Sequence, residues 1–235
     1  MKTAPAIPDE KALTFPVWHT ATLLGMIAAL IGLSTMIHGA THSGINHRLA
    51  GYFVIMTVEW AMVIWIAFGC HIQGESIYSF LGGFTARWRT ILRDSALAVG
   101  FLVLANLLLG LMRHLVAATP NEGLKNLLPH TSMERVAFLG LTLTAAFCEE
   151  LIYRGYLQRQ FAARTRNLPM GIVLQGIVFG VSHAYQGLAM VLVVAVYGCL
   201  FGLLAAWRKS LRPGMIAHLL QDVVGGLILA RLVLK

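Results

Sequence analysis

The sequence predicts an all-α membrane protein, a polytopic bundle of about seven transmembrane helices, with six to eight allowed. Of its 235 residues, 57% are hydrophobic and only 12% are charged, whereas soluble domains carry roughly 25% charged residues. The apolar residues also form long blocks, and a helix of about 20 such residues crosses the hydrocarbon core of a bilayer. These two observations favour a multi-pass membrane protein over a soluble domain.

Seven apolar blocks account for the predicted spans, and the fourth should continue as an amphipathic helix to Arg164, where the chain becomes basic. The blocks are Trp18–Ile37, Leu49–Cys70, Asp94–Ala117, Met133–Tyr153, Leu168–Tyr185, Leu188–Trp207 and Pro213–Leu234. Most ionisable residues within these blocks lie in the last four. We therefore divide the chain into residues 1–132, an N-terminal segment plus three spans, and 133–235, a functional membrane core. Both parts should form one integrated membrane domain.

The net charge of +8 is carried by small clusters between the apolar blocks. The clusters are Arg87, Arg89 and Arg93; Arg159, Arg164 and Arg166; and Arg208, Lys209 and Arg212. This pattern is typical of cytoplasmic loops and predicts a multi-pass protein of the cell (inner) membrane with its N-terminus inside. The continuous basic surface that a nucleic acid requires is not visible, so the expected partners are the lipid bilayer and a peptide or protein substrate.

Two adjacent carboxylates, Glu149 and Glu150, lie near the end of the fourth block. On a helix they point about 100° apart, so they should have different roles. Glu150 and Arg154 stand at i and i+4 in the favourable order for an ion pair, which would leave Glu149 free to face the bundle. A carboxylate in such a site can act as a general base. The alternative is that both glutamates are simply solvated where the helix leaves the membrane.

Polar residues on two later blocks add to this pair. His183 lies late in the fifth block, and His218 shares a helical face with Asp222 in the seventh. An ionisable group in hydrocarbon costs at least ~2.5 kcal/mol, which marks each as a candidate functional residue. Glu149, His183 and His218 could hold a water molecule through zinc, or Glu149 could deprotonate it directly while a histidine steadies the substrate carbonyl. Both alternatives are hydrolytic.

The three motifs resemble those of the CPBP family, the CAAX protease and bacteriocin-processing membrane proteins also called Abi. EELIYR resembles EExxxR, FGVSH resembles FxxxH, and HLLQD resembles HxxxN/D. Residues 133–235 would then be the catalytic core of an intramembrane endopeptidase related to type II CaaX prenyl proteases.

The resemblance also implies roles. Glu149 would activate water, Glu150 and Arg154 would organise the helix, His183 would help to hold the water, and His218 and Asp222 would sit at the substrate carbonyl. The prenyl proteases have Asn where this chain has Asp222. Because ionised Asp cannot donate a hydrogen bond, either Asp222 is protonated or His218 is the donor. The older description of the family as metalloproteases leaves Zn(II) as a candidate cofactor.

Other functions also fit parts of the sequence. A catalytically silent scaffold or immunity-type protein would keep the fold without turnover, and a small proton-coupled transporter would use Glu59 and Glu149 as proton sites. Glu59 lies in the second block, outside the motifs, and serves either structural pairing or the handling of substrate or protons. The serine hydrolase alternative is weaker, because Ser182 and His183 are adjacent and diverge on a helix.

Overall fold

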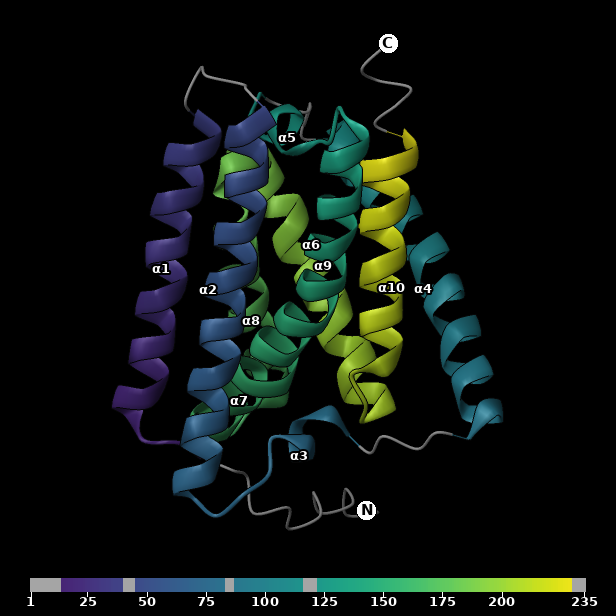
Figure 1. Ribbon diagram of the computed structural model, residues 1–235. Helices are drawn as coiled ribbons and strands as arrows, with labels where there is room; N and C mark the ends of the chain where they lie inside the picture. Colours follow the sequence, from purple (N-terminus) through teal and green to yellow (C-terminus); the bar gives the residue numbers. More distant parts are fainter. Residues whose placement is uncertain (1–13, 40–44, 83–86, 116–121, 230–235) are drawn as a thin grey trace.

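The computed structural model describes residues 14–39, 45–82, 87–115 and 122–229, and every regular element in those ranges is a helix (Figure 1). The first half of the chain contains α1 (Val17–Gly39), α2 (Ile45–Ile72), α3 (Tyr78–Leu81), α4 (Trp88–Leu115) and α5 (Glu122–Leu127). The second half contains α6 (Ser132–Glu149), η1 (Glu150–Leu157), α7 (Gln158–Thr165), α8 (Leu168–Ser182), η2 (Ala184–Gln186), α9 (Leu188–Arg208), α10 (Arg212–Val223) and η3 (Val224–Leu229). The predicted all-α class is confirmed.

Five of the described helices are long and apolar enough to cross a membrane: Val17–Ser34, His47–Ile72, Trp88–Leu115, Ser132–Thr165 and Leu188–Arg208. Each of the seven predicted blocks nevertheless corresponds to a helix. The fifth, α8, has 15 residues, which at ~1.5 Å per residue falls short of a core about 30 Å thick. The seventh block is divided between α10 and η3, and its last residues lie outside the described ranges. The polytopic bundle is thus as predicted, with fewer full-length spans.

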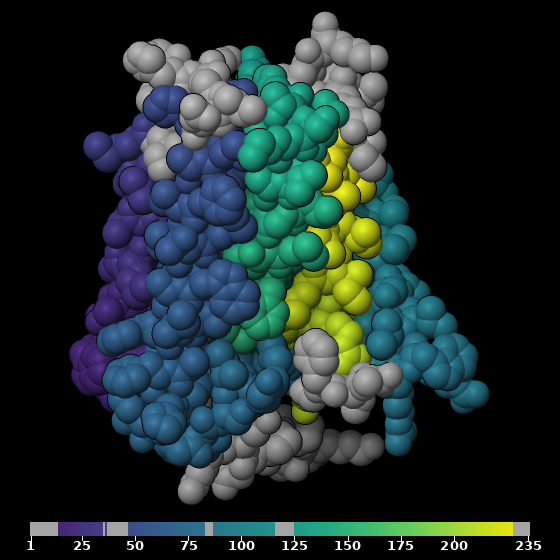
Figure 2. Space-filling model, viewed as in Figure 1, coloured from purple at the N-terminus to yellow at the C-terminus, as the bar shows by residue number. Residues whose placement is uncertain are grey.

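The helices of the second half lie at the centre of the bundle. In Figure 1, α1 and α2 cover one side and α4 lies at the other, beside α10. The space-filling view shows α2, α6 and α10 side by side on the front face (Figure 2). Large apolar side chains such as Ile64, Leu104 and Val136 are exposed on the outer surface. Such a surface suits contact with lipid chains.

A single continuous helix, formed by α6, η1 and α7, carries the EELIYR motif. It begins at a capping box in which Thr131 accepts from the Glu134 backbone and Glu134 accepts from the Thr131 backbone. From Glu150 to Leu157 the hydrogen bonding becomes π-helical, a local widening that often occurs at functional sites. The helix then continues to Thr165, as predicted from the basic residues.

Glycines allow α8 to pack closely on its neighbours, as expected for membrane bundles. A Cβ at Gly180 would lie 2.7 Å from the Ala195 Cβ of α9, and one at Gly176 would lie 2.9 Å from the Ala195 carbonyl oxygen. At Gly171 the added carbon would instead lie 2.7 Å from Ala162 of α7. These close approaches hold α8 at the position from which His183 enters the site.

Candidate active site

Glu150 and Arg154 form a buried ion pair on the π-helical segment. Arg154 Nη1 lies 3.1 Å from Glu150 Oε1, and both side chains are inaccessible to solvent. The Arg154 guanidinium lies between two rings, 4.2 Å from the Phe179 centroid and 5.0 Å from the Phe201 centroid. Glu150 reaches α10 because Gly214 has no side chain: a Cβ there would lie 2.6 Å from Glu150 Oε2. The Phe of the FGVSH motif thus contacts the Arg of EELIYR.

His218 of α10 lies among three carboxylates. Its Nδ1 is 3.2 Å from Glu150 Oε1, and its Nε2 is 3.5 Å from Glu149 Oε2 and 3.7 Å from Asp222 Oδ2. The ring is 7% exposed, so its orientation is fixed by these neighbours and by Phe201, whose centroid is 5.7 Å away. Only an imidazolium carries a hydrogen on both nitrogens, so that Nδ1 can donate to Glu150 while Nε2 faces Glu149 and Asp222.

Glu149 faces a different direction from Glu150, as predicted for adjacent residues on a helix. Its side chain is 17% exposed, and its Oε2 is buried without a hydrogen-bond partner. A buried carboxylate oxygen without a donor has free capacity to accept from a bound molecule. Glu149 therefore combines proximity to His218 with an unused acceptor.

The His183 ring is oriented by its own helix. His183 Nδ1 lies 2.9 Å from the Phe179 carbonyl oxygen, so it is the protonated nitrogen and donates to that oxygen. The other nitrogen, Nε2, then carries a lone pair. Ser182 Oγ also donates to the Phe179 carbonyl, at 2.7 Å, and lies on the Nδ1 side of the ring at 3.2 Å. Ser182 is therefore not positioned for activation by His183 Nε2, which disfavours the serine hydrolase alternative.

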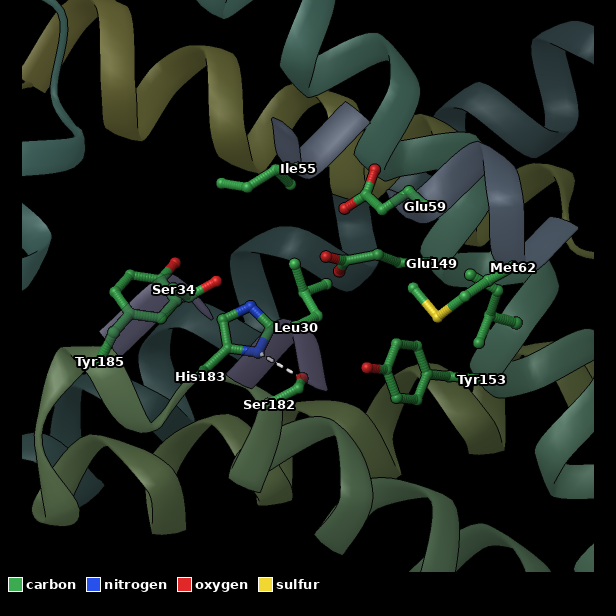
Figure 3. A pocket seen from close by; sticks show the side chains of 11 residues that line it. Leu30, Ser34, Ile55, Glu59, Met62, Glu149, Tyr153, Ser182, His183 and Tyr185 are labelled. Carbon is green, nitrogen blue, oxygen red and sulfur yellow. Dashed lines mark hydrogen bonds between the residues drawn. The ribbon is translucent and has the colours of Figure 1, made fainter. Parts of the chain in front are cut away.

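A cavity of about 60 Å³ lies between α1, α2, the motif helix and the end of α8. It exceeds the roughly 10–15 Å³ that one water molecule needs. Figure 3 shows Glu59, Glu149 and His183 turned toward it, with the Tyr153 and Tyr185 rings around them. The lining residues are Leu30, Ser34, Ile55, Glu59, Met62, Glu149, Ile152, Tyr153, Ser182, His183 and Tyr185. Glu149 and His183 therefore share one small cavity.

The Phe179 ring and the Glu149 side chain connect His183 with His218. Phe179, one turn before His183 on α8, is the residue whose ring approaches both of them, at 4.6 Å from His183 and 6.3 Å from His218. Glu149 joins the two histidines, because it lines the cavity with His183 and also lies 3.5 Å from His218. The structure thus brings all six predicted site residues into one connected cluster centred on Glu149.

The donor set proposed for zinc is not arranged as a metal site. Within the part of the chain that the structure describes, no three His, Cys, Asp or Glu side chains are grouped so that they could hold a metal ion. Glu149 and His218 are 3.5 Å apart, and His183 lines the same cavity as Glu149. The three residues do not fit the tetrahedral geometry that zinc requires.

Several cavity residues could not be identified from the motifs alone. Tyr153 lies inside EELIYR, and its hydroxyl is hydrogen-bonded to Ser182. Nothing in the sequence distinguishes it from an aromatic residue of the hydrophobic core. Tyr185 and Ser34 line the cavity and sit at span ends, where polar residues are common. Glu59 could be found, because a carboxylate in an apolar block is conspicuous. The residues that surround Glu59 could not be predicted, because they come from helices distant in the sequence.

Comparison with known proteins shows that part of the chain is similar to a described protein family. Residues 131–224 match the family described as Type II CAAX prenyl endopeptidase Rce1-like. Searches of curated proteins and of solved structures gave no match. The matched segment contains Glu149, His183 and His218 and leaves α1 to α5 outside. The long apolar helices make the chain a multi-pass membrane protein, and over residues 131–224 it is similar to this CAAX protease family.

Proposed function

We propose that the protein is an intramembrane endopeptidase that hydrolyses a peptide bond of a membrane-associated protein or peptide with water activated by Glu149. One observation carries the proposal. Glu149 presents a buried, unpartnered carboxylate oxygen in the cavity that His183 also lines, and it lies 3.5 Å from His218. A base, an acceptor for the second water proton and a donor for the oxyanion are the groups that hydrolysis requires.

In the proposed reaction, a water molecule in the cavity donates one proton to the Glu149 carboxylate and a hydrogen bond to His183 Nε2. Its oxygen attacks the carbonyl carbon of the scissile bond, and the carbonyl oxygen takes up the negative charge. Glu149 then passes the proton to the leaving nitrogen as the carbon–nitrogen bond breaks. General base catalysis of this kind contributes about 10²- to 10⁴-fold to the rate.

His218 is the proposed donor to the oxyanion. Glu150 accepts from its Nδ1 at 3.2 Å and thereby orients Nε2 toward the side of Glu149 and Asp222. Arg154 in turn holds Glu150. The Asp at position 222, where prenyl proteases have Asn, then needs no proton of its own, because His218 rather than Asp222 donates to the oxyanion. A hydrogen bond to one ring nitrogen fixes the orientation of an imidazole and leaves the other nitrogen for the reaction.

The family description names a CAAX prenyl endopeptidase, which makes an internally quenched, farnesylated CAAX peptide in proteoliposomes a suitable first probe. The wild type should cleave it, and Glu149→Ala should lose cleavage while remaining folded. Ser182→Ala is the matched control, since the cavity also contains this residue but the mechanism does not use it. A metal chelator should leave the rate unchanged.

Two results would count against this function. Unchanged turnover by Glu149→Ala would remove Glu149 as the base. Loss of activity on chelation, together with stoichiometric zinc in the active protein, would replace direct glutamate catalysis with metal catalysis. A scaffold that keeps the fold without turnover predicts no cleavage of any peptide and a normal cellular role for Glu149→Ala.

A further inference from the structure

Glu59 is a second carboxyl group in the cavity, and the mechanism above does not use it. It lies on α2, outside residues 131–224 that match the family, and it is only 1% exposed. Its Oε2 is buried without a hydrogen-bond partner. A buried, unpartnered carboxylate in a membrane helix is costly, which makes a purely incidental position improbable on energetic grounds.

The Glu59 carboxyl approaches Glu149 rather than a cation. The two side chains lie within hydrogen-bonding reach of each other, and Figure 3 shows their carboxyl groups side by side at the cavity. Neither group can donate to the other while both are ionised. A hydrogen bond between them therefore requires that one of the two carries a proton.

The surroundings of the two carboxyl groups indicate that Glu59, and not Glu149, carries the proton. None of the ion pairs among the described residues involves Glu59, whereas Glu149 is more exposed and lies 3.5 Å from His218 Nε2. Placing a negative charge on Glu59 would put it beside the Glu149 carboxylate with no cation paired to Glu59 among the described residues, which is strongly unfavourable in a buried site. The titratable groups that face Glu59 from the packed elements are Cys148, Glu149, Tyr153, His183, Tyr185 and Asp222.

We propose that Glu59 is a positioning residue: its protonated carboxyl donates a hydrogen bond to one oxygen of the Glu149 carboxylate and leaves the other oxygen to take the proton from water. This inference rests on the proposed function for its catalytic meaning. The proton itself is not consumed, since Glu59 keeps it throughout the cycle. Glu59 thus fixes the direction of the base and stabilises its ionised form.

Infrared spectroscopy of the purified protein reports the protonation state of the Glu59 carboxyl group and needs no substrate. At neutral pH, the wild-type-minus-Glu59→Gln difference spectrum should show a carboxylic acid C=O band that shifts in heavy water. Glu134→Gln is the matched control, because Glu134 is also a fully buried carboxylate but pairs with Arg48. The wild-type-minus-Glu134→Gln difference spectrum should instead show a carboxylate band, because the substitution removes an ionised group. A carboxylate band in the Glu59 difference spectrum would overturn the proposal.

The pH dependence of peptide cleavage provides the functional test. Glu59→Gln keeps a weaker donor and Glu59→Leu keeps none, so the acid limb of kcat/KM should move up by about one pH unit and about two pH units, respectively. Near the optimum, Glu59→Gln should retain most turnover. In Glu134→Gln the acid limb should stay at the wild-type position even if the protein melts earlier. An acid limb that does not move in Glu59→Gln would contradict the proposal.

The two failures can be told apart. Full turnover by Glu149→Ala would refute the proposed base, while the infrared result would still report whether Glu59 is protonated. An inactive Glu149→Ala variant together with wild-type behaviour of Glu59→Gln in both measurements would refute only the role of Glu59. If Glu59→Leu does not fold, Glu59→Gln alone decides the outcome.

Discussion

The contact between Gly214 and Glu150 offers a sensitive test of how His218 is held. Replacing Gly214 by Ala would place a Cβ 2.6 Å from Glu150 Oε2 and 3.3 Å from its Cδ. Restoring an ordinary contact of about 3.4 Å requires the carboxylate to move by roughly 0.8 Å. The other side of the carboxylate is occupied by Arg154 and His218, at 3.1 and 3.2 Å.

This displacement should break or badly misalign the bond from His218 Nδ1, because a change of roughly 0.8 Å in either direction takes the 3.2 Å distance out of the hydrogen-bonding range. A hydrogen bond to a charged group contributes about 1.5–3 kcal/mol. If that energy orients His218 for the transition state, kcat/KM should fall about 10- to 150-fold.

The assay is cleavage of the farnesylated peptide by purified Gly214→Ala, with the melting temperature measured in parallel. Gly110→Ala on α4 is the matched control, because no atom lies within 4 Å of a Cβ added there. That substitution should keep wild-type activity and gain a little helix stability, up to about 1 kcal/mol. Wild-type kcat/KM in Gly214→Ala would refute the role assigned to the Glu150–His218 contact.

Three further substitutions follow from the same contacts. Arg154→Met leaves the fully buried Glu150 without its partner and should cost about 3–5 kcal/mol of stability, measured as a lower melting temperature in detergent; an unchanged value would contradict a buried ion pair. His183→Ala should lower turnover by about 10- to 10³-fold with little change in melting temperature, and equal losses of both would indicate a packing role instead. Gly176→Leu should separate α8 from α9 and impair folding, whereas Gly25→Leu, in open space, should be tolerated; the reverse order would contradict the close helix contact.

Much of the fold could be predicted because hydrophobic length is a strong signal in membrane proteins. Each predicted block corresponds to a helix, and the extension of the fourth to the basic residues was also correct. Five helices in the described part of the chain are long enough for full spans, whereas seven apolar blocks were predicted. The short helix α8 and the division of the last block into α10 and η3 depend on packing against neighbours, which hydropathy does not encode.

The ion pair between Glu150 and Arg154 could be predicted from i,i+4 spacing, since both residues lie on one helix. Spacing could not predict that Gly214 admits Glu150 to α10, or that Phe179 packs on Arg154. Nor could it place Glu59 beside Glu149, because those contacts join helices far apart in the sequence. The π-helical turn at the motif likewise has no single-residue signal that would reveal it.

The central claim is that the Glu149 carboxylate activates water. The most direct measurement compares single-turnover cleavage of the peptide by the wild type and by Glu149→Gln, which has nearly the same shape but cannot accept a proton from water. The mechanism predicts a loss of about 10²- to 10⁴-fold in the rate of cleavage with peptide binding retained. Cleavage by Glu149→Gln at the wild-type rate would contradict it.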